Sequence, residues 1–348
     1  MDLMTYAEKL RFGEIHVVSD ERTGLKAIVA LHNLKMGPAI GGCRCIPYPS
    51  SAAAMKDVMR LARGMTYKSA ISKLNHGGGK SVIMRPARLD AGTKDRQELF
   101  EKFAEFLDSL HGKYLVAEDS GTSIHDMDII RSKTEHVLGS GASGASGDPS
   151  PFTALGVRRG IEAAVKFRYG RDDMDGIHVA LQGLGNVGYH LASELHELGA
   201  SLTVTDVRPD IVERAVVEFG AKAVKPDDIY AVDADIFTPC ALGAVINDMT
   251  LPQLKVDIVA GAANNQLAED RHGAALVEKG ILYAPDYAIN AGGLINVASE
   301  FEGYDIEKSR KKTFAIYDTM LGIFDRAQTE RVPTNVVADL IVEEIIYA

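Results

Sequence analysis

Cysteine is scarce in this chain, and its scarcity excludes two kinds of scaffold. Only Cys43, Cys45 and Cys240 occur among the 348 residues. Three thiols are too few, and odd in number, for a disulfide framework. A Cys-x-Cys pair without a second pair of ligands is also a poor zinc site. We therefore expect neither a fold held by disulfides nor a bound metal.

Long apolar runs and clusters of basic residues are also rare. No apolar run approaches the roughly 20 residues that a membrane-spanning helix needs, and "MDLMTYAEKLRFGE" lacks the basic start and apolar run of a signal peptide. The net charge of −10 opposes a nucleic-acid surface, which needs clustered Lys and Arg. The basic segment at 307–314 is typical of the solvated face of a helix. We expect a cytoplasmic protein that binds neither membrane nor nucleic acid.

The chain does contain enough apolar material for two domain cores. It has 348 residues, of which 46% are hydrophobic. The segment "GSGASGASGDPSP" (139–151) has the Gly, Ser, Ala and Pro content of a linker. We expect a hinge there, between a first domain over 1–145 and a second over 146–329. The C-terminal helix, about 330–348, is expected to join the first domain.

The two expected domains differ in their pattern of strands and helices. The first is mixed α/β, with strand-like segments at 15–20, 25–33, 81–85 and 114–119 and helical segments from about Ser51 and over 96–110. In the second, short apolar strands alternate with helices, at 177–182, 201–206, 234–239, 257–262 and 280–285. That alternation predicts a parallel, doubly wound sheet. Residues 305–348 are expected to be helical, broken by Pro333 into two helices.

A glycine motif in the second domain predicts a dinucleotide site. Gly183, Gly185 and Gly188 follow an apolar strand and open a helix. The first two glycines permit a tight turn and close approach of a pyrophosphate, and the helix start offers free N–H groups. Asp206, at the end of the next strand, would accept hydrogen bonds from ribose hydroxyls and repel a 2′-phosphate, which favours NAD over NADP. The alternative is a glycine-rich turn required for packing alone.

The segment "LNHGGGKSVIM" (74–84) resembles the end of a phosphate-binding loop, but its details argue against one. The loop pattern G-x-x-x-x-G-K-[ST] requires glycine at position 74, which is leucine here. The strand-like residues also follow Lys80, whereas a phosphate loop has its strand before the lysine. The glycines, which have no side chains, are instead expected to clear space for a substrate beside Lys80.

A second lysine and an acid extend this candidate site. Lys68 follows Val58, Ala62 and Met65 at helical spacing on an apolar stripe. One lysine could hold a carboxylate while a desolvated neighbour acts as general base. The alternative is two surface lysines with their stems along apolar surface. Asp119 ends a strand, where α/β sheets bind ligands, so it could shuttle a proton; otherwise it caps a helix or stabilises a turn.

Several segments together resemble one family of enzymes. They are "GPAIGGCR" (37–44), "RLARGMTYKSA" (60–70), "LNHGGGKSVI" (74–83), "AEDSGTS" (117–123), "QGLGNVGYHL" (182–191), "TPCALGAVIND" (238–248), "AGAANNQLAEDRHG" (260–273) and "YAPDYAINAGGLINVASE" (283–300). The chain resembles the NAD-dependent amino-acid dehydrogenases of the glutamate, leucine, phenylalanine and valine superfamily, and most of all its leucine-specific branch.

The resemblance implies a fold, a reaction and catalytic roles. The fold would be an N-terminal α/β domain and a Rossmann-type domain separated by a cleft. The reaction would be reversible oxidative deamination of an L-amino acid to a 2-oxo acid and ammonia, with hydride passing to NAD. Lys68, with the backbone at Gly41 and Gly42, would bind the substrate carboxylate. Lys80 would activate water, and Asp119 would move protons to and from the amino group. The family also implies a homo-oligomer.

The resemblance also implies which residues contact the cofactor and the substrate side chain. The adenosine and pyrophosphate would be held by Gly183, Gly185, Asn186, Val187, Gly188 and Asp206. The nicotinamide end would be lined by Thr153, Ala241 and Asn264, the last also close to the substrate, and Cys240 and Ala262 would contact the cofactor as well. The side-chain pocket would be lined by Ile40, Ala117, Leu294 and Val297.

The four pocket residues are all apolar, which decides the expected substrate. A glutamate side chain would lose its hydration there without finding a partner, so leucine, isoleucine and valine are favoured. An aromatic substrate, phenylalanine or tryptophan, is the alternative, because a small change in pocket volume involves only about 1–3 kcal/mol. A non-catalytic nucleotide-binding protein is less favoured, since Lys68, Lys80 and Asp119 are all present.

Overall fold

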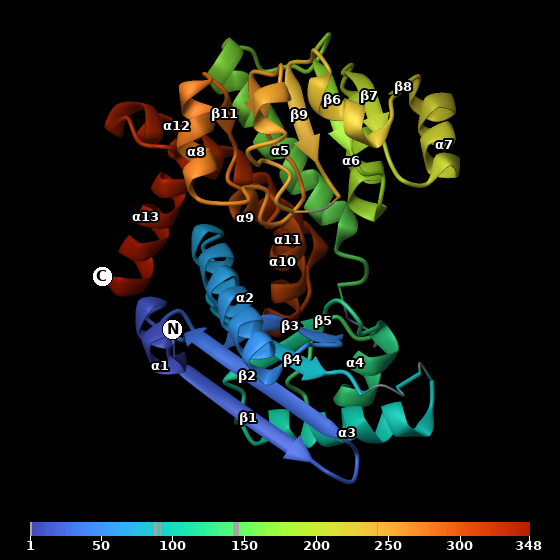
Figure 1. Ribbon diagram of the computed structural model, residues 1–348, viewed down its shortest axis with the longest axis vertical. Coiled ribbons are helices and arrows are strands. Elements are labelled where there is room, and N and C mark those ends of the chain that lie inside the picture. Colours follow the sequence, from blue (N-terminus) through green and yellow to red (C-terminus); the bar gives the residue numbers. More distant parts are fainter. Residues whose placement is uncertain (1, 87–88, 91, 142–145, 242) are drawn as a thin grey trace. The chain divides into compact units, whose positions relative to one another are not determined.

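The computed structural model describes residues 2–86, 89–90, 92–141, 146–241 and 243–348. The chain forms two compact units (Figure 1). Unit 1 contains Met1–Gly147, Val297–Asp305 and Ile345–Ala348, and unit 2 contains Asp148–Asn296 and Ile306–Glu344. The chain therefore passes between the units more than once, which a single boundary in the sequence does not express.

The C-terminal helix α13 (Thr334–Tyr347) is grouped differently from the sequence-based expectation. All but its last residues belong to unit 2 rather than to the first domain. The Thr334 hydroxyl donates to the backbone oxygen of Tyr283 at 2.7 Å, and the Tyr287 hydroxyl donates to Asp339 at 2.8 Å. These contacts join α13 to the end of the parallel sheet, and sequence periodicity carries no information about them.

The expected hinge at 139–151 lies partly outside the described residues, because 142–145 are not among them. On either side of that gap, the backbone N–H groups of Gly139 and Ser146 donate to the Glu300 carboxylate at 3.0 and 2.6 Å. Helix α5 then begins at Ser150. The hinge function of this segment stays a prediction.

Unit 1 is built on a five-stranded mixed sheet with the order β1-β2-β4-β3-β5. Strand β2 is antiparallel to both β1 and β4, whereas β3 is parallel to both β4 and β5. Strand β3 therefore lies between β4 and β5. The strands are β1 (Glu14–Asp20), β2 (Leu25–Asn33), β3 (Ala39–Ile46), β4 (Gly77–Met84) and β5 (Tyr114–Glu118).

Helices cover both faces of this sheet (Figure 1). Alternate residues of β2 point to opposite faces, as the period of a strand requires. Ile28 and Ala30 pack in one apolar cluster with α2, while Val29 and Leu31 pack in the other with α3. The helices of unit 1 are α1 (Leu3–Lys9), α2 (Ser51–Ile71), α3 (Lys94–Asp108) and α4 (Ile124–Arg131).

Two strands of unit 1 differ from the sequence-based assignment. No strand was expected over Ala39–Ile46, which is β3, and β4 begins at Gly77 rather than at Ser81. Both segments contain consecutive glycines, which have low strand propensity. Their extended conformation comes from pairing with neighbouring strands, because β3 and β4 are each bonded on both sides.

Unit 2 contains the predicted doubly wound sheet. Its six strands are all parallel, in the order β11-β10-β9-β6-β7-β8. Ala180, Phe237 and Val259 from adjacent strands belong to one buried cluster, which also contains Leu276 of α8. The strands are β6 (His178–Gln182), β7 (Ser201–Thr205), β8 (Lys222–Ala223), β9 (Ile236–Pro239), β10 (Ile258–Val259) and β11 (Leu282–Tyr283).

The remaining helices show one difference from expectation near the C-terminus. Three helices rather than two follow residue 305, because the chain breaks at Ala315 as well as before Pro333. The helices are α5 (Ser150–Tyr169), α6 (Asn186–Glu197), α7 (Pro209–Phe219), α8 (Arg271–Glu278), α9 (Asp286–Ile289), α10 (Gly292–Ala298), α11 (Ile306–Phe314) and α12 (Ile316–Glu330).

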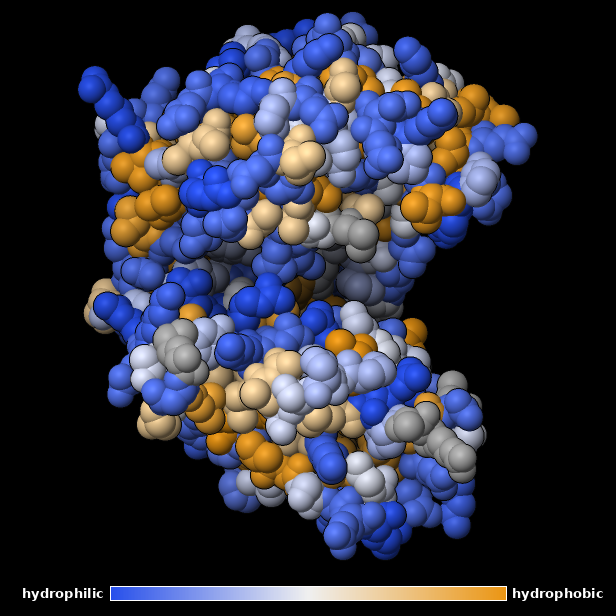
Figure 2. Space-filling view, viewed as in Figure 1, coloured by the Kyte–Doolittle hydropathy of each residue, from blue (hydrophilic) through white to orange (hydrophobic). Residues whose placement is uncertain are grey.

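The face of the molecule shown in Figure 2 mixes hydrophilic residues with apolar ones. The large exposed apolar side chains include Val17 on the edge strand β1, which is 65% exposed. None of the helices in the described ranges combines the length and the apolar character that crossing a membrane requires.

Candidate functional site

In unit 1, Lys80 and Asp119 form a buried ion pair. Lys80 Nζ lies 2.7 Å from Asp119 Oδ2, and the lysine side chain is only 8% exposed. Lys80 is on β4 and Asp119 follows β5, so the pair reaches across β3. A Cβ atom at Gly42 on β3 would lie 2.7 Å from Asp119 Cβ and 3.0 Å from Lys80 Nζ. Glycine at position 42 therefore leaves the room in which the two side chains meet.

The Asp119 carboxylate is held in its charged form. Burial raises the pKa of this carboxyl, but Lys80, the backbone N–H of Ser120 and Arg44 outweigh it and leave the pKa below its usual value. The backbone N–H of Asp119 donates to Thr122 Oγ1 at 2.9 Å, which stabilises the turn after β5. The cap of helix α4 is Ser123 instead. The alternative interpretation of Asp119 as a helix cap is therefore wrong.

The glycines before Lys80 make room for the protein itself. A Cβ atom at Gly78 would lie 1.9 Å from the backbone nitrogen of Thr66 in α2, and one at Gly77 would lie 2.1 Å from the backbone oxygen of Asn33. Substitution at either position would push against backbone. The expectation that these glycines clear space for a substrate is corrected: they let α2 and β2 approach β4 closely.

The other residues of unit 1 that were expected to contact the substrate lie on strands β3 and β5 and on helix α2. The backbone oxygen of Gly41 accepts a hydrogen bond from the Tyr114 hydroxyl at 2.6 Å. Ile40 is buried, whereas Ala117 is partly exposed on β5. Lys68 is partly exposed in the last turn of α2. All of these candidate residues belong to unit 1.

The structure explains His76, which sequence patterns did not. Its side chain is buried, with the ring edge-to-face against Phe301 at a centroid distance of 5.2 Å. Phe301 belongs to the segment 297–305, which returns to unit 1 late in the chain. The contact therefore joins two parts of unit 1 that are far apart in sequence.

In unit 2, the glycine motif forms the turn between β6 and α6. Gly183 has φ +97, a conformation that favours glycine, and its N–H donates to the backbone oxygen of Thr205 at 2.8 Å. A Cβ atom at Gly188 would lie 2.0 Å from the backbone oxygen of Gly183. At Gly185, by contrast, a Cβ atom would meet nothing within 4 Å. Packing therefore explains two of the three glycines and leaves the middle one facing open space.

The start of α6 follows directly from this turn. Gly185 is the N-cap of the helix and makes no side-chain cap hydrogen bond, and Asn186, Val187 and Gly188 form the first turn. Helix N-termini present N–H groups and a partial positive charge. The geometry suits a pyrophosphate.

Asp206 is oriented by backbone N–H groups at the end of β7. Its carboxylate accepts hydrogen bonds from the N–H of Leu184 at 2.7 Å and of Arg208 at 2.9 Å. Burial raises the pKa of this carboxyl, but these hydrogen bonds and the Arg208 guanidinium lower it overall. The Arg208 side chain is 55% exposed and lies 3.3 Å from the carboxylate. Asp206 is therefore an ionised acceptor joined to the glycine turn.

Part of the expected nicotinamide end assembles around the glycine turn. The N–H of Cys240 donates to the backbone oxygen of Gln182 at 2.7 Å, and Ala241 follows it beside Gly183. Asn290, which the sequence interpretation did not include, is buried and donates to the backbone oxygen of Ala262 at 2.9 Å and to Asn264 Oδ1 at 2.8 Å. Its sequence neighbours "NAGG" gave no sign of this contact.

Three further residues were expected at the site: Thr153, Leu294 and Val297. The hydrogen bonds of the glycine turn described above do not include them. The Thr153 hydroxyl donates to the backbone oxygen of Pro149 at 3.0 Å. Leu294 and Val297 are both partly exposed on α10, one turn apart, although Val297 is grouped with unit 1.

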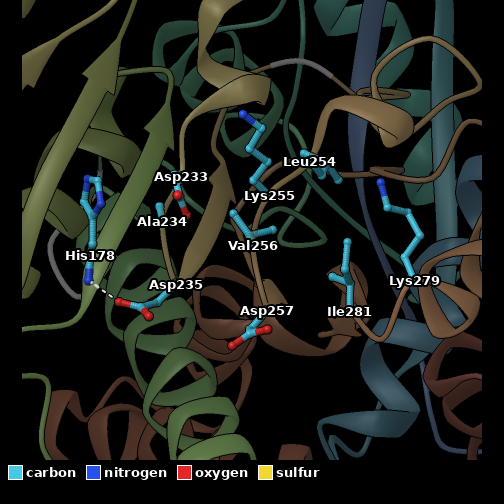
Figure 3. A pocket seen from close by; sticks show the side chains of 10 residues that line it. All are labelled: His178, Asp233, Ala234, Asp235, Leu254, Lys255, Val256, Asp257, Lys279 and Ile281. Carbon is cyan, nitrogen blue, oxygen red and sulfur yellow. Dashed lines mark hydrogen bonds between the residues drawn. The ribbon is translucent and has the colours of Figure 1, made fainter.

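A pocket of about 480 Å³ lies at the amino ends of strands in the parallel sheet (Figure 3). Its lining includes His178, which begins β6, and Asp235 and Asp257, which directly precede β9 and β10. The glycine motif follows the carboxyl end of β6. Ligands of open α/β sheets bind at carboxyl ends, so this pocket does not belong to the dinucleotide site.

A parallel sheet with a glycine turn at its first helix and an acid after its second strand defines a dinucleotide-binding unit of Rossmann type. Two family profiles also match the chain: "Glu/Leu/Phe/Val dehydrogenase, dimerisation domain" over residues 10–136, and "Glutamate/Leucine/Phenylalanine/Valine dehydrogenase" over residues 210–305. The chain belongs to this family. It is an amino-acid dehydrogenase, and its family implies a nicotinamide cofactor.

Individual relatives agree over nearly the whole chain. Leucine dehydrogenase of Geobacillus stearothermophilus is 51% identical over 346 residues, which is 99% of this chain and 93% of that protein. L-tryptophan dehydrogenase of Nostoc punctiforme is 47% identical over 321 residues, 92% of this chain and 89% of that protein. A crystal structure of the Nostoc punctiforme enzyme superposes with a TM-score of 0.89 at 42% identity, covering 99% and 98% of the two chains.

Proposed function

We propose that the protein catalyses the reversible NAD-dependent oxidative deamination of L-leucine and other branched-chain L-amino acids. The products are the 2-oxo acid and ammonia. The observation that carries the proposal is the buried pair of Lys80 and Asp119, with 2.7 Å between Nζ and Oδ2. The identity of 51% with a leucine dehydrogenase supports the choice of substrate.

The catalytic roles follow from the charges of this pair. Asp119 is an ionised carboxylate, so it accepts a proton from the substrate ammonium group and returns one to the leaving ammonia. Lys80 lies beside it, and in its uncharged amine form it takes a proton from the water that attacks the imine carbon. Lys68 holds the substrate carboxylate with the backbone at Gly41 and Gly42. A positioned acid or base of this kind contributes about 10²–10⁴ in rate.

The choice of a branched-chain substrate depends on four apolar side chains. Ile40, Ala117, Leu294 and Val297 offer no cation or hydroxyl to a second carboxylate. Burying an unpaired charge costs several kcal/mol, so glutamate is disfavoured. The aromatic alternative is supported by the identity of 47% with L-tryptophan dehydrogenase.

The residues of unit 2 fit a dinucleotide, and we propose NAD. The open position at Gly185 and the uncapped start of α6 suit a pyrophosphate. Asp206 accepts ribose hydroxyl protons and repels a 2′-phosphate. Ala241 and Asn264 lie toward the nicotinamide end, with Asn290 orienting Asn264. Bound there, a nicotinamide would supply the acceptor for the hydride that leaves the substrate α-carbon.

We further propose that the protein is a homo-oligomer. The family profile that matches residues 10–136 is described as a dimerisation domain. Strand β1 within it is an edge strand with the exposed side chain Val17. Unpaired strand edges are common sites of association.

The test of the reaction is a substrate panel. NADH absorbance is followed at alkaline pH with NAD and leucine, valine, phenylalanine, tryptophan or glutamate, and kcat/KM is compared. Leucine is expected to give the highest value. Higher values with phenylalanine or tryptophan would move the assignment to an aromatic dehydrogenase. Absence of turnover with every aliphatic and aromatic L-amino acid would contradict the enzyme proposal.

The test of the site is the substitution Lys80→Ala. We expect turnover to fall by about 10²–10⁴, because the general base is lost. Lys26→Ala is the matched control, since Lys26 is an exposed lysine on the adjacent strand β2. Lys26→Ala should retain full activity. Retained activity in Lys80→Ala would remove Lys80 from the mechanism.

A further inference from the structure

Arg44 contacts the candidate catalytic acid but belongs to none of the roles assigned above. It lies on β3, between the strands that carry Lys80 and precede Asp119. Arg44 Nε donates to Asp119 Oδ2 at 3.3 Å, the same oxygen that lies 2.7 Å from Lys80 Nζ. Two cations therefore converge on one carboxylate oxygen.

The other end of the Arg44 guanidinium is anchored to helix α2. Its NH1 group donates to Asp57 Oδ2 at 2.9 Å, and the Tyr48 hydroxyl donates to the same oxygen at 2.8 Å. Arg44 and Asp57 side chains are 22% and 19% exposed. The fork of the guanidinium thus links two carboxylates from different parts of unit 1.

Helix α2 also carries Lys68, the expected substrate-binding lysine. Asp57 and Lys68 are three helical turns apart and lie on nearly the same side of α2, because an α-helix has 3.6 residues per turn. An ion pair that holds Asp57 therefore fixes the helix from which Lys68 projects. Because Arg44 contacts both Asp57 on that helix and Asp119, it fixes the position of the helix relative to Asp119.

The charges around Asp119 come from several elements. Lys80 faces it from β4, Arg44 and Cys43 from β3, and Tyr114 from β5. Burial raises the pKa of the Cys43 thiol and of the Tyr114 phenol, so both stay neutral. Asp119 and Asp57 thus face three cations, Lys80, Arg44 and Arg60, and of these Arg44 alone contacts both carboxylates.

We propose that Arg44 is a positioning residue for the proton transfer of Asp119: with Lys80 it holds Oδ2, which leaves Oδ1 to exchange the proton with the substrate amino group. This inference rests on the proposed function of Asp119. Arg44 does not touch the substrate in this role. It acts by keeping the carboxylate ionised and correctly turned.

The experiment compares Arg44→Gln, Arg44→Lys and the wild-type protein in pH profiles of kcat and kcat/KM for leucine. In Arg44→Gln we expect kcat to fall by about 10–100-fold, because small misplacements of catalytic groups cost up to that factor. The acidic limb of the profile should move to higher pH, since Asp119 loses a neighbouring cation. Arg44→Lys keeps the charge but cannot bridge both carboxylates, so it should shift the limb less.

Arg60→Gln is the matched control. Arg60 donates to the other oxygen of Asp57 at 3.2 Å, is 52% exposed, and has no ion pair with Asp119. The pH profiles of kcat and kcat/KM for Arg60→Gln should match those of the wild-type protein. NADH binding should be equal in all four proteins, because the dinucleotide residues belong to unit 2.

Carboxyl NMR of Asp119 separates this inference from the proposed function. An upward shift of the Asp119 titration in the Arg44 variants, together with the moved limb, supports the positioning role. A folded Arg44→Gln or Arg44→Lys protein with an unmoved limb overturns it, even when kcat is lower. If Arg44→Gln does not fold, Arg44→Lys decides alone. Wild-type protein without turnover overturns the proposed function and the inference with it.

Discussion

Gly78 in unit 1 and Gly185 in unit 2 belong to segments that look alike in sequence, but they face opposite surroundings. A Cβ atom at Gly78 would lie 1.9 Å from the backbone of α2, whereas one at Gly185 would meet no atom within 4 Å. The first glycine is required by the protein's own packing. The second is not, and the open space beside it adjoins a helix start. Glycine surrounded by protein thus indicates architecture. Open space alone does not indicate a ligand, since Gly64 within α2 is equally open; at Gly185 the second observation is the adjoining helix start.

Acidic residues of the two units also differ in the groups that surround their carboxylates. Asp119 and Asp126 in unit 1 are paired with the partly or fully buried cations Lys80, Arg44 and Arg96. Asp206 in unit 2 is held mainly by backbone N–H groups, with an exposed arginine beside it. The two acids of unit 1 are therefore held by charge pairs, while Asp206 is held by the backbone of the glycine turn and of the residues after β7.

The largest effect is expected from Gly78→Ala. The new methyl group would overlap backbone atoms of Thr66, and α2 cannot move without leaving the sheet. We expect a loss of at least about 4–5 kcal/mol in the free energy of unfolding, or no folded unit 1. Urea unfolding measures this loss.

Gly64→Ala is the control for this prediction. Gly64 is exposed within α2, and a Cβ atom there meets nothing within 4 Å. Alanine is a better helix former than glycine, so the control should gain about 0.5–1 kcal/mol. Similar stability of the two variants would show that packing does not require Gly78.

The second-largest loss of stability is expected from a substitution in the buried ion pair of Arg96 and Asp126. Their side chains are 9% and 1% exposed, and Arg96 Nε lies 2.8 Å from Asp126 Oδ1. Asp126→Asn leaves the arginine unpaired, so we expect a loss of about 3–5 kcal/mol at pH 7. The exposed Asp128 on the same helix provides the control Asp128→Asn, which should lose far less.

The Asp126 effect has a defined pH dependence. Burial raises the pKa of this carboxyl, but hydrogen bonds from Arg96 and Ser123 lower it overall in the folded protein. The stabilisation is therefore complete above the unfolded-state pKa of about 3.9 and is lost as pH falls through the lower folded-state value. Urea unfolding of wild type and Asp126→Asn should converge toward acid. A constant difference down to pH 2 would refute the ion-pair explanation.

A smaller effect is expected from Asp206→Ala, which tests the acid of unit 2. Loss of a charged hydrogen-bond acceptor costs about 1.5–3 kcal/mol, so NAD binding should weaken by about 10–100-fold. NADP binding should weaken less, because the repulsion of its 2′-phosphate is removed as well. Isothermal titration with both cofactors measures the difference. Equal losses for NAD and NADP would contradict the ribose contact.

The smallest effect on the fold is expected from Gly185→Ala. Its backbone has φ −65 and ψ −173, which alanine adopts freely, so unfolding should change by no more than about 1 kcal/mol. A methyl group facing the pyrophosphate should still weaken NADH binding, by about tenfold. Fluorescence titration checks this. Unchanged binding would show that the open space beside Gly185 is not the ligand side.

Local patterns predicted much of unit 2 and less of unit 1. The strands of the parallel sheet are short apolar runs between helices, so their presence and their parallel arrangement could be predicted from the sequence. Strand β3 could not be, because Gly41 and Gly42 have low strand propensity and pair only when β4 and β5 are in place. The start of β4 at Gly77 was missed for the same reason.

The sequence by itself determined the candidates for the site: two lysines, an acid after a strand, and a glycine motif followed by an acid. Only the tertiary structure decided which of them meet. Lys80 and Asp119 come together because β3 inserts between their strands with glycine at position 42, and Arg44 joins them from that same strand. Contacts across a sheet depend on strand order, and strand order is a long-range property that local periodicity does not encode.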